Sequence, residues 1–192
     1  AVGQERIYEV QEKEYTITGT IDSISYQLRE EIVEAFLSGQ DSAFVIYRYI
    51  RMTPEEDWMF LETWQARRNA RQAIVTEGNK PFLKMTFPVF AGKTWNGNRL
   101  NTEDEDIFLL DSLNFPFEYE EEQFENTLTV IQSDNQDFIV EQDRRYEVYA
   151  SGVGLVYKSE LILQYCTESD CLGQQIIETG RELEQYLTTY EN

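Results

Sequence analysis

The segment RYEVYASGVGLVYKSELILQYCTESDC, residues 145–171, decides the fold of this chain. From Val153 to Tyr165 apolar and aromatic side chains recur at nearly every second position. A period of two over this length predicts a β-strand that buries mainly one face. The same alternation precedes residues 151–154, where two glycines favour a tight hairpin turn. We therefore predict an antiparallel hairpin, with a short helix over residues 141–150 as the alternative.

Cys166 and Cys171, the only cysteines, enclose four residues at the end of that predicted hairpin. Because the chain has no histidine and no further cysteine, the usual zinc ligand sets cannot be assembled. The spacing also differs from the Cys-x-x-Cys of redox enzymes. We predict a local disulfide that fixes a turn and contributes only about 2 kcal/mol, with two free thiols as the alternative.

The rest of the chain shows short alternating runs separated by turn residues. Residues 23–37 fit both helical spacing and alternation, and we favour a strand because a turn and a strand-forming run follow them. Residues 138–140 (Phe-Ile-Val) are predicted as a further short strand. Residues 181–190 fit either a closing strand or a final helix, since Leu183 and Leu187 are four residues apart.

These patterns predict a mainly β fold, an antiparallel meander that forms a curved sheet or an open or partial barrel. At most one or two short helices are expected. A length of 192 residues fits a single domain over the whole chain, with residues 1–5 loose. The chain begins Ala-Val-Gly-Gln, and we expect any signal peptide or lipidated cysteine to have been removed from it.

The chain is strongly acidic, with 36 acidic and 16 basic residues and a net charge of −20. The second half, residues 97–192, carries 22 of the acids and only 5 of the bases. Such a surface repels phosphate backbones and anionic headgroups, so we expect no nucleic-acid partner and no charge-driven membrane binding. The acidic belt at residues 103–125 lacks the glycine of a calcium loop. A solvated acidic face is favoured, and calcium binding at the surface is an alternative.

Four aromatic residues are candidate walls of a ligand cleft. Trp58, Phe60 and Trp64 would share one face of a strand predicted over residues 58–65. Trp95 lies in the turn-rich segment FPVFAGKTWNGN (87–98). Aromatic rings in such places stack on sugars or planar ligands, although core packing is their commoner role.

The sequence argues against most kinds of catalysis. Without histidine, the ordinary serine and cysteine hydrolase triads are excluded. The Gly-Val-Gly at residues 152–154 lacks the third glycine of a dinucleotide loop and the lysine of a P-loop. We predict no catalytic residues, no metal ligands and no cofactor; a carboxylate-dependent glycan hydrolase is the alternative.

Three segments carry a family resemblance: FPVFAGKTWNGN (87–98), EVYASGVGLVYKSE (147–160) and YCTESDCLGQQIIETG (165–180). They resemble segments of envelope lipoproteins of unknown function from Bacteroidetes-type bacteria. In that family similar turn and hairpin motifs follow a signal peptide that ends in a lipidated cysteine. The resemblance implies a β-rich fold in the periplasm or on the outer-membrane surface, attached to the membrane only through a lipid anchor, and it carries over no catalytic residue.

Together these observations predict an exported, non-catalytic envelope protein. We expect it to act as a binding or scaffold module for an apolar, glycan or protein partner.

Overall fold

The computed structural model describes residues 1–120 and 122–191, which form twelve β-strands and no helix. All twelve strands belong to one antiparallel sheet with the order β6-β5-β4-β3-β2-β1-β12-β11-β10-β9-β8-β7. Two six-stranded meanders are thus joined where the terminal strands β1 and β12 pair. The predicted antiparallel meander is confirmed. The strand bounds are β1 Glu5–Tyr15, β2 Ile21–Ser38, β3 Asp41–Arg51, β4 Met59–Arg68, β5 Gln72–Glu77, β6 Lys80–Thr86, β7 Thr94–Asn96, β8 Ile107–Tyr119, β9 Glu122–Asn135, β10 Glu141–Ala150, β11 Gly154–Tyr165 and β12 Ile177–Tyr190.

The segments with two possible secondary structures are all strands. Residues 23–37 lie inside β2, residues 141–150 form β10, and residues 181–190 lie inside β12. In β12 the backbone is paired on one side with β1 and on the other with β11, and this pairing outweighs the helical spacing of the leucines. The predicted short strand at residues 138–140 is wrong, because these residues form the turn between β9 and β10.

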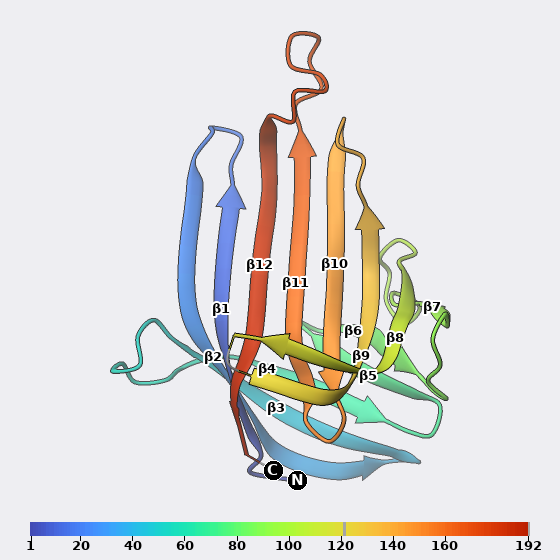
Figure 1. The fold of residues 1–192 in the computed structure, drawn as a ribbon. Coiled ribbons are helices and arrows are strands. Elements are labelled where there is room, and N and C mark those ends of the chain that lie inside the picture. The colour runs from blue at the N-terminus through green and yellow to red at the C-terminus, as the bar shows by residue number, and fades with distance from the viewer. Residues whose placement is uncertain (121, 192) are drawn as a thin grey trace.

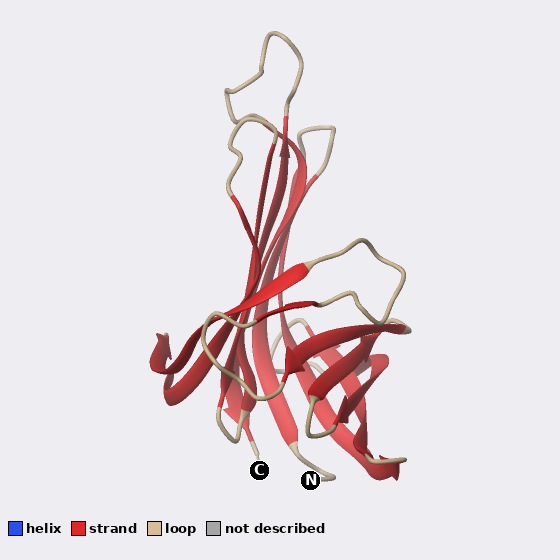
Figure 2. Ribbon diagram, turned by 90° about the vertical axis from the view of Figure 1, so that its right-hand side faces the viewer, coloured by secondary structure: helices blue, strands red, loops and turns tan. Residues whose placement is uncertain are grey.

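The sheet has two differently shaped halves. Figure 1 shows the long strands β2, β1, β12, β11 and β10 standing side by side, with both termini at the lower end. Figure 2 shows the upper half as a single layer of strands, whereas the remaining strands curl round the lower half.

The two edge strands meet in this lower half. The amide of Leu83 in β6 donates a hydrogen bond to the carbonyl of Gly97, just after β7, over 2.8 Å. The indole Nε1 of Trp95 donates to the carbonyl of Leu83, also over 2.8 Å. We call this junction the seam, and it brings the curled sheet close to a closed barrel. A buried cluster holds it together: Ile74, Leu83, Met85, Trp95, Phe108, Leu110 and Val130.

Glycine is required at one position of the seam for reasons of space. A Cβ atom on Gly97 would lie 2.3 Å from the ring of Phe108, which is closer than real contacts allow. The absence of a side chain therefore lets the chain after β7 pass directly over the Phe108 ring.

A second buried cluster lies where β1 and β12 pair. Tyr8 is fully buried and is paired across the strands with Leu28 on one side and Leu187 on the other. The end of the β8–β9 hairpin crosses the opposite face of the sheet (Figure 1). Its Tyr119 ring lies 4.9 Å from the ring of Tyr157 and 4.6 Å from that of Tyr186. Both faces of the sheet are therefore covered at this level.

The described residues include no helix that could span a membrane. At the N-terminus, which was predicted to be loose, the Gly3 amide donates to the Ile32 carbonyl over 2.8 Å and the Ile32 amide donates to the Gln4 carbonyl over 3.0 Å.

Candidate functional site

A polar hollow lies beside the seam. It has a volume of about 300 Å³, at the lower end of the range for small-molecule sites. We call it the seam pocket. Charged and amide side chains dominate its lining, with two phenylalanine rings among them: Glu77, Lys80, Phe82, Lys84, Asn98, Glu103, Asp106, Phe108, Gln132, Arg145, Lys158 and Glu160.

A buried ion-pair network borders the pocket. Lys84 Nζ lies 2.9 Å from Glu147 Oε1 and 2.9 Å from Glu77 Oε1. Glu147 is only 1 % exposed, and it also accepts a hydrogen bond from the hydroxyl of Tyr149. Burial by itself raises the pKa of Glu147, but the positive charges of Lys84 and Lys158 outweigh it and lower the pKa from 4.5 to about 2. Glu147 is therefore ionised at every physiological pH.

The other charges that line the pocket are paired as well. Arg145 bridges Asp106 at 2.9 Å and Asp143 at 2.6 Å, while Lys158 lies 2.7 Å from Glu160. Burial raises the pKa of Glu160, yet Lys158 more than compensates, so that the pKa is lowered overall. The pocket thus offers four cations and four carboxylates in nearly neutral balance.

Gln132 is the exception among these polar groups. Its side chain is buried in β9 at the pocket wall. Within residues 1–120 and 122–191 its amide makes no side-chain hydrogen bond. An amide with free donors and an acceptor, beside paired charges and the ring of Phe82, suits a ligand rich in hydroxyl groups.

Sequence reasoning missed the seam pocket because its residues come from six strands and from the connection between β7 and β8. Lys84 and Glu147 are 63 positions apart. The local pattern around Glu147 predicts a strand and nothing more. Only the long-range order of the strands in the sheet shows that the two side chains meet.

The four predicted cleft aromatics are not brought together. Trp95 is buried in the seam cluster, with its ring 6.1 Å from that of Phe108. Trp64 is paired with Ile46, and the guanidinium of Arg48 lies 3.6 Å from its ring. Neither side chain lines the seam pocket.

Phe60 and Trp64 lie on opposite faces of β4, so the expectation that they share a face is wrong. Arg48 is paired with Glu62 but Tyr49 with Phe60, which leaves Leu61 as an extra residue in a β-bulge. A bulge shifts the register by one, and every side chain beyond it changes face.

Phe60 and Trp58 belong to an aromatic cluster on the other face. The ring of Phe60 lies 5.6 Å from that of Tyr47 and 5.8 Å from that of Tyr49. The guanidinium of Arg51 lies 4.3 Å from the ring of Trp58. We call Tyr47, Tyr49, Trp58 and Phe60 the outer aromatic patch; a ligand role for these residues stays a prediction.

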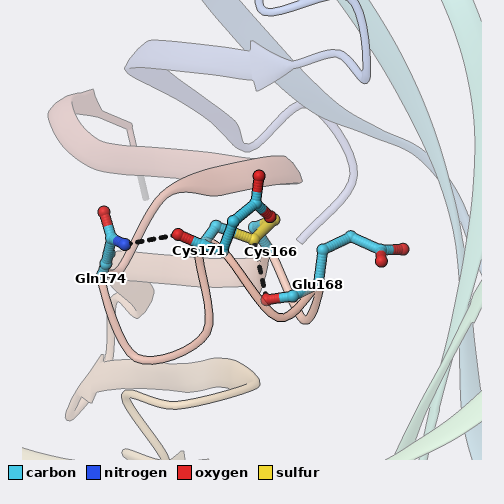
Figure 3. Close-up of a disulfide and its surroundings, with 5 residues drawn as sticks. Cys166, Glu168, Cys171 and Gln174 are labelled. Atoms are coloured by element: carbon cyan, nitrogen blue, oxygen red, sulfur yellow. Dashed lines mark hydrogen bonds between the residues drawn. A yellow bond between two sulfur atoms is a disulfide. The ribbon is translucent and has the colours of Figure 1, made fainter.

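Cys166 and Cys171 form the predicted disulfide, with their Cα atoms 5.8 Å apart. Figure 3 shows the bond within a small loop between β11 and β12, where Gln174 Nε2 donates to the carbonyl of Asp170. The bond therefore closes a turn, as predicted, in the loop at the end of the sheet that is farthest from both termini (Figure 1).

The acidic belt is divided between separate parts of the fold. Glu103 pairs with Lys80, and Asp106 pairs with Arg145. Residues 118–120 and 122–125 lie at the end of the β8–β9 hairpin, and Glu121 lies outside the described residues. In the described ranges no three histidine, cysteine, aspartate or glutamate side chains are placed to hold a metal ion.

Comparisons with known proteins identify the fold. No protein-family model matches the chain, and no curated protein sequence matches it. The crystal structure of a Bacteroides fragilis protein, described as exported and as having a YmcC-like fold, matches with a TM-score of 0.55 and 10 % identity over 100 % of this chain and 97 % of that one. A protein from Parabacteroides distasonis described as a lipoprotein matches with a TM-score of 0.49 and 8 % identity over 100 % and 96 %. The first of these likenesses shows a shared fold.

Proposed function

We propose that this chain is a non-catalytic binding module of the cell envelope and that the seam pocket binds a glycan. The observation that carries the proposal is the pocket itself. It combines paired charges, an unused glutamine amide and a phenylalanine ring in a hollow of about 300 Å³. An apolar ligand would have to strip water from eight charged groups without replacing their hydrogen bonds, whereas sugar hydroxyls can replace them.

The envelope location rests on three supports. The sequence motifs resemble those of envelope lipoproteins, and the B. fragilis protein that shares the fold is described as exported. The disulfide suits an oxidising compartment outside the cytoplasm.

The lowered pKa values of Glu160 in the pocket and of Glu147 beside it support binding without catalysis. A glycosidase needs one carboxylic acid with a raised pKa to protonate the leaving group. The pKa values of Glu147 and Glu160 are both lowered, so neither is suited to that task. The acids that line the pocket are held in ion pairs with Lys80, Lys84, Arg145 and Lys158.

Titration of the ¹⁵N-labelled chain with a panel of neutral and acidic oligosaccharides tests the proposal. We expect one class of glycan to shift the amide signals of the strands around the pocket. Replacing Gln132 by leucine, which keeps the size but removes the amide, should weaken binding at least about tenfold. Gln123→Leu is the matched control, because Gln123 lies on the same strand, is exposed and is outside the pocket.

Two results would overturn the proposal. If no oligosaccharide in the panel shifts the pocket signals, or if Gln132→Leu binds as tightly as the parent chain, the seam pocket is not a glycan site. Signal changes confined to Tyr47, Trp58 and Phe60 would assign glycan binding to the outer aromatic patch instead. Release of product from chromogenic glycosides would contradict the absence of catalysis.

A further inference from the structure

Three connections gather at the end of the sheet that is farthest from both termini (Figure 1). Residues 14–24 contain the β1–β2 turn, residues 134–143 the β9–β10 turn, and residues 166–178 the disulfide loop between β11 and β12. We call these three segments the distal end. They lie at the ends of neighbouring strands. Tyr15 is paired with Gly180, two residues after the disulfide loop, and Tyr165, one residue before it, donates its amide to the Val140 carbonyl over 2.9 Å.

The distal end displays an unusual number of apolar side chains to solvent. Single exposed apolar residues are normal on a protein surface, but a gathering from three neighbouring loops marks an interaction site. Between the β1–β2 turn and the disulfide loop lies a hollow of about 200 Å³ that is lined in part by Ile21 and Ile177. The exposed apolar residues are Ile17, Ile21, Ile24, Phe138, Ile139, Val140, Leu172 and Ile176.

The charge at the distal end has a single sign. Its three segments contain nine carboxylates and no lysine or arginine: Glu14, Asp22, Asp134, Asp137, Glu141, Asp143, Glu168, Asp170 and Glu178. In the described part of the chain only two of them pair with a cation, Asp134 with Arg144 and Asp143 with Arg145. Anionic lipid, nucleic acid and a second copy of this acidic surface are all repelled by such a field.

The disulfide loop holds its apolar side chains in place. Cys166 is fixed in two ways. Its side chain is bonded to Cys171, and its backbone amide donates a hydrogen bond to the Ile176 carbonyl over 2.8 Å. The Leu172 amide donates to the Glu168 carbonyl over 2.9 Å (the loop is shown in Figure 3). A bond that orders an exposed loop lowers the entropy lost when a partner binds.

We propose that the distal end is the docking surface for a protein partner that presents a segment of alternating basic and apolar side chains. Basic side chains complement the unpaired carboxylates, and apolar ones cover the exposed isoleucines and leucine. This inference adds a protein partner to the proposed function. It rests on that function only in assuming that the chain lies in the cell envelope. Both termini lie at the opposite end, so a lipid anchor ahead of Ala1 would leave the distal end facing away from the membrane.

The test uses a ten-residue peptide of alternating lysine and leucine as the probe. Two control peptides separate the contributions: alternating lysine and serine keeps the charge, and alternating glutamate and leucine keeps the apolar side chains. Titrated into the ¹⁵N-labelled chain, the lysine–leucine peptide should shift amide signals in residues 14–24, 134–143 and 166–178. Both controls should bind at least about tenfold more weakly, and added salt should weaken all binding by the lysine peptides.

Matched variants locate the surface. The triple variant Ile21→Ser/Ile139→Ser/Leu172→Ser should reduce affinity at least about tenfold. Leu37→Ser should leave affinity unchanged, because Leu37 is also exposed but lies next to the β2–β3 turn, at the other end of the sheet. Reduction of the disulfide should weaken binding severalfold while the thermal unfolding midpoint shows that the sheet is still folded.

Three outcomes would overturn the inference: signal changes confined to the acidic hairpin end at residues 118–125, equal binding by the triple variant, or binding of phosphatidylglycerol vesicles in preference to the peptide. The glycan titration of the seam pocket is independent of each of them, so failure here leaves the proposed function standing.

Discussion

The seam and the distal end use the same kinds of side chain in opposite ways. At the seam the carboxylates of Glu77 and Glu147 are held by Lys84, and the apolar side chains are packed in a buried cluster. At the distal end most carboxylates have no cation in the described chain, and eight apolar side chains face solvent. The contrast teaches that net charge and hydrophobicity alone do not assign a role. The partner of each side chain decides whether it stabilises the fold or is free to bind.

The largest expected effect is the loss of the buried ion pair at the seam. Glu147→Gln leaves the Lys84 ammonium buried with only Glu77 as its partner. We expect the free energy of unfolding to fall by about 3–5 kcal/mol, the usual cost of breaking a buried pair from one side. Urea unfolding followed by tryptophan fluorescence measures it. Asp134→Asn, which removes the exposed pair with Arg144, is the control and should cost less than about 1 kcal/mol.

The same ion pair predicts how stability depends on pH. Because the pKa of Glu147 is lowered to about 2 in the folded chain, its contribution is fully present above the unfolded value of 4.5. It is lost as the pH falls from about 5 to 2, a decrease of about 3 kcal/mol. Urea unfolding at a series of pH values checks this. The Glu147→Gln variant should show a shallower decrease over that range, and an unchanged slope would mean that Glu147 is not the group that titrates.

A smaller effect is expected for the disulfide. Cys166→Ser/Cys171→Ser opens a loop of only a few residues, so the free energy of unfolding should fall by no more than about 2 kcal/mol. Differential scanning calorimetry of the two chains measures the change. A loss as large as that of Glu147→Gln would show that the disulfide loop stabilises the whole sheet. That result would contradict the distinction between a stabilising seam and a distal end that is free to bind.

The smallest effect is expected from single exposed residues of the distal end. Leu172 is 53 % exposed and Ile17 is 80 % exposed, so little apolar area returns to water when either becomes serine. We expect each substitution to change the free energy of unfolding by less than about 0.5 kcal/mol. Thermal unfolding of the two variants beside the parent chain checks this, and a cost above about 2 kcal/mol would mean that the side chain is packed.

Much of the fold could be predicted from local pattern. The alternation in residues 153–165 and the glycines at residues 152 and 154 place the β10–β11 hairpin, and both glycines adopt positive φ angles. The strand predicted at residues 138–140 was wrong because β-branched and aromatic composition predicts a strand wherever it occurs. There the apolar triplet forms the turn between β9 and β10, and all three side chains are exposed.

The candidate sites were harder to predict than the fold. Trp64 was assigned to the face of Phe60 because the bulge at Leu61 leaves no trace in the composition of the strand. The pairing of Lys84 with Glu147 depends on how the two ends of a twelve-stranded sheet meet. Local sequence periodicity contains no information about that meeting, so the seam pocket becomes visible only in three dimensions.

Hydrogen–deuterium exchange of the free chain, repeated with the lysine–leucine peptide, tests the division between the two regions most directly. We predict that amides of residues 146–150 and 154–158 exchange only through global unfolding, while residues 136–140 and 167–175 exchange orders of magnitude faster and slow down when the peptide is added. Equal protection of both regions in the free chain, or protection by the peptide only at the seam, would contradict the account.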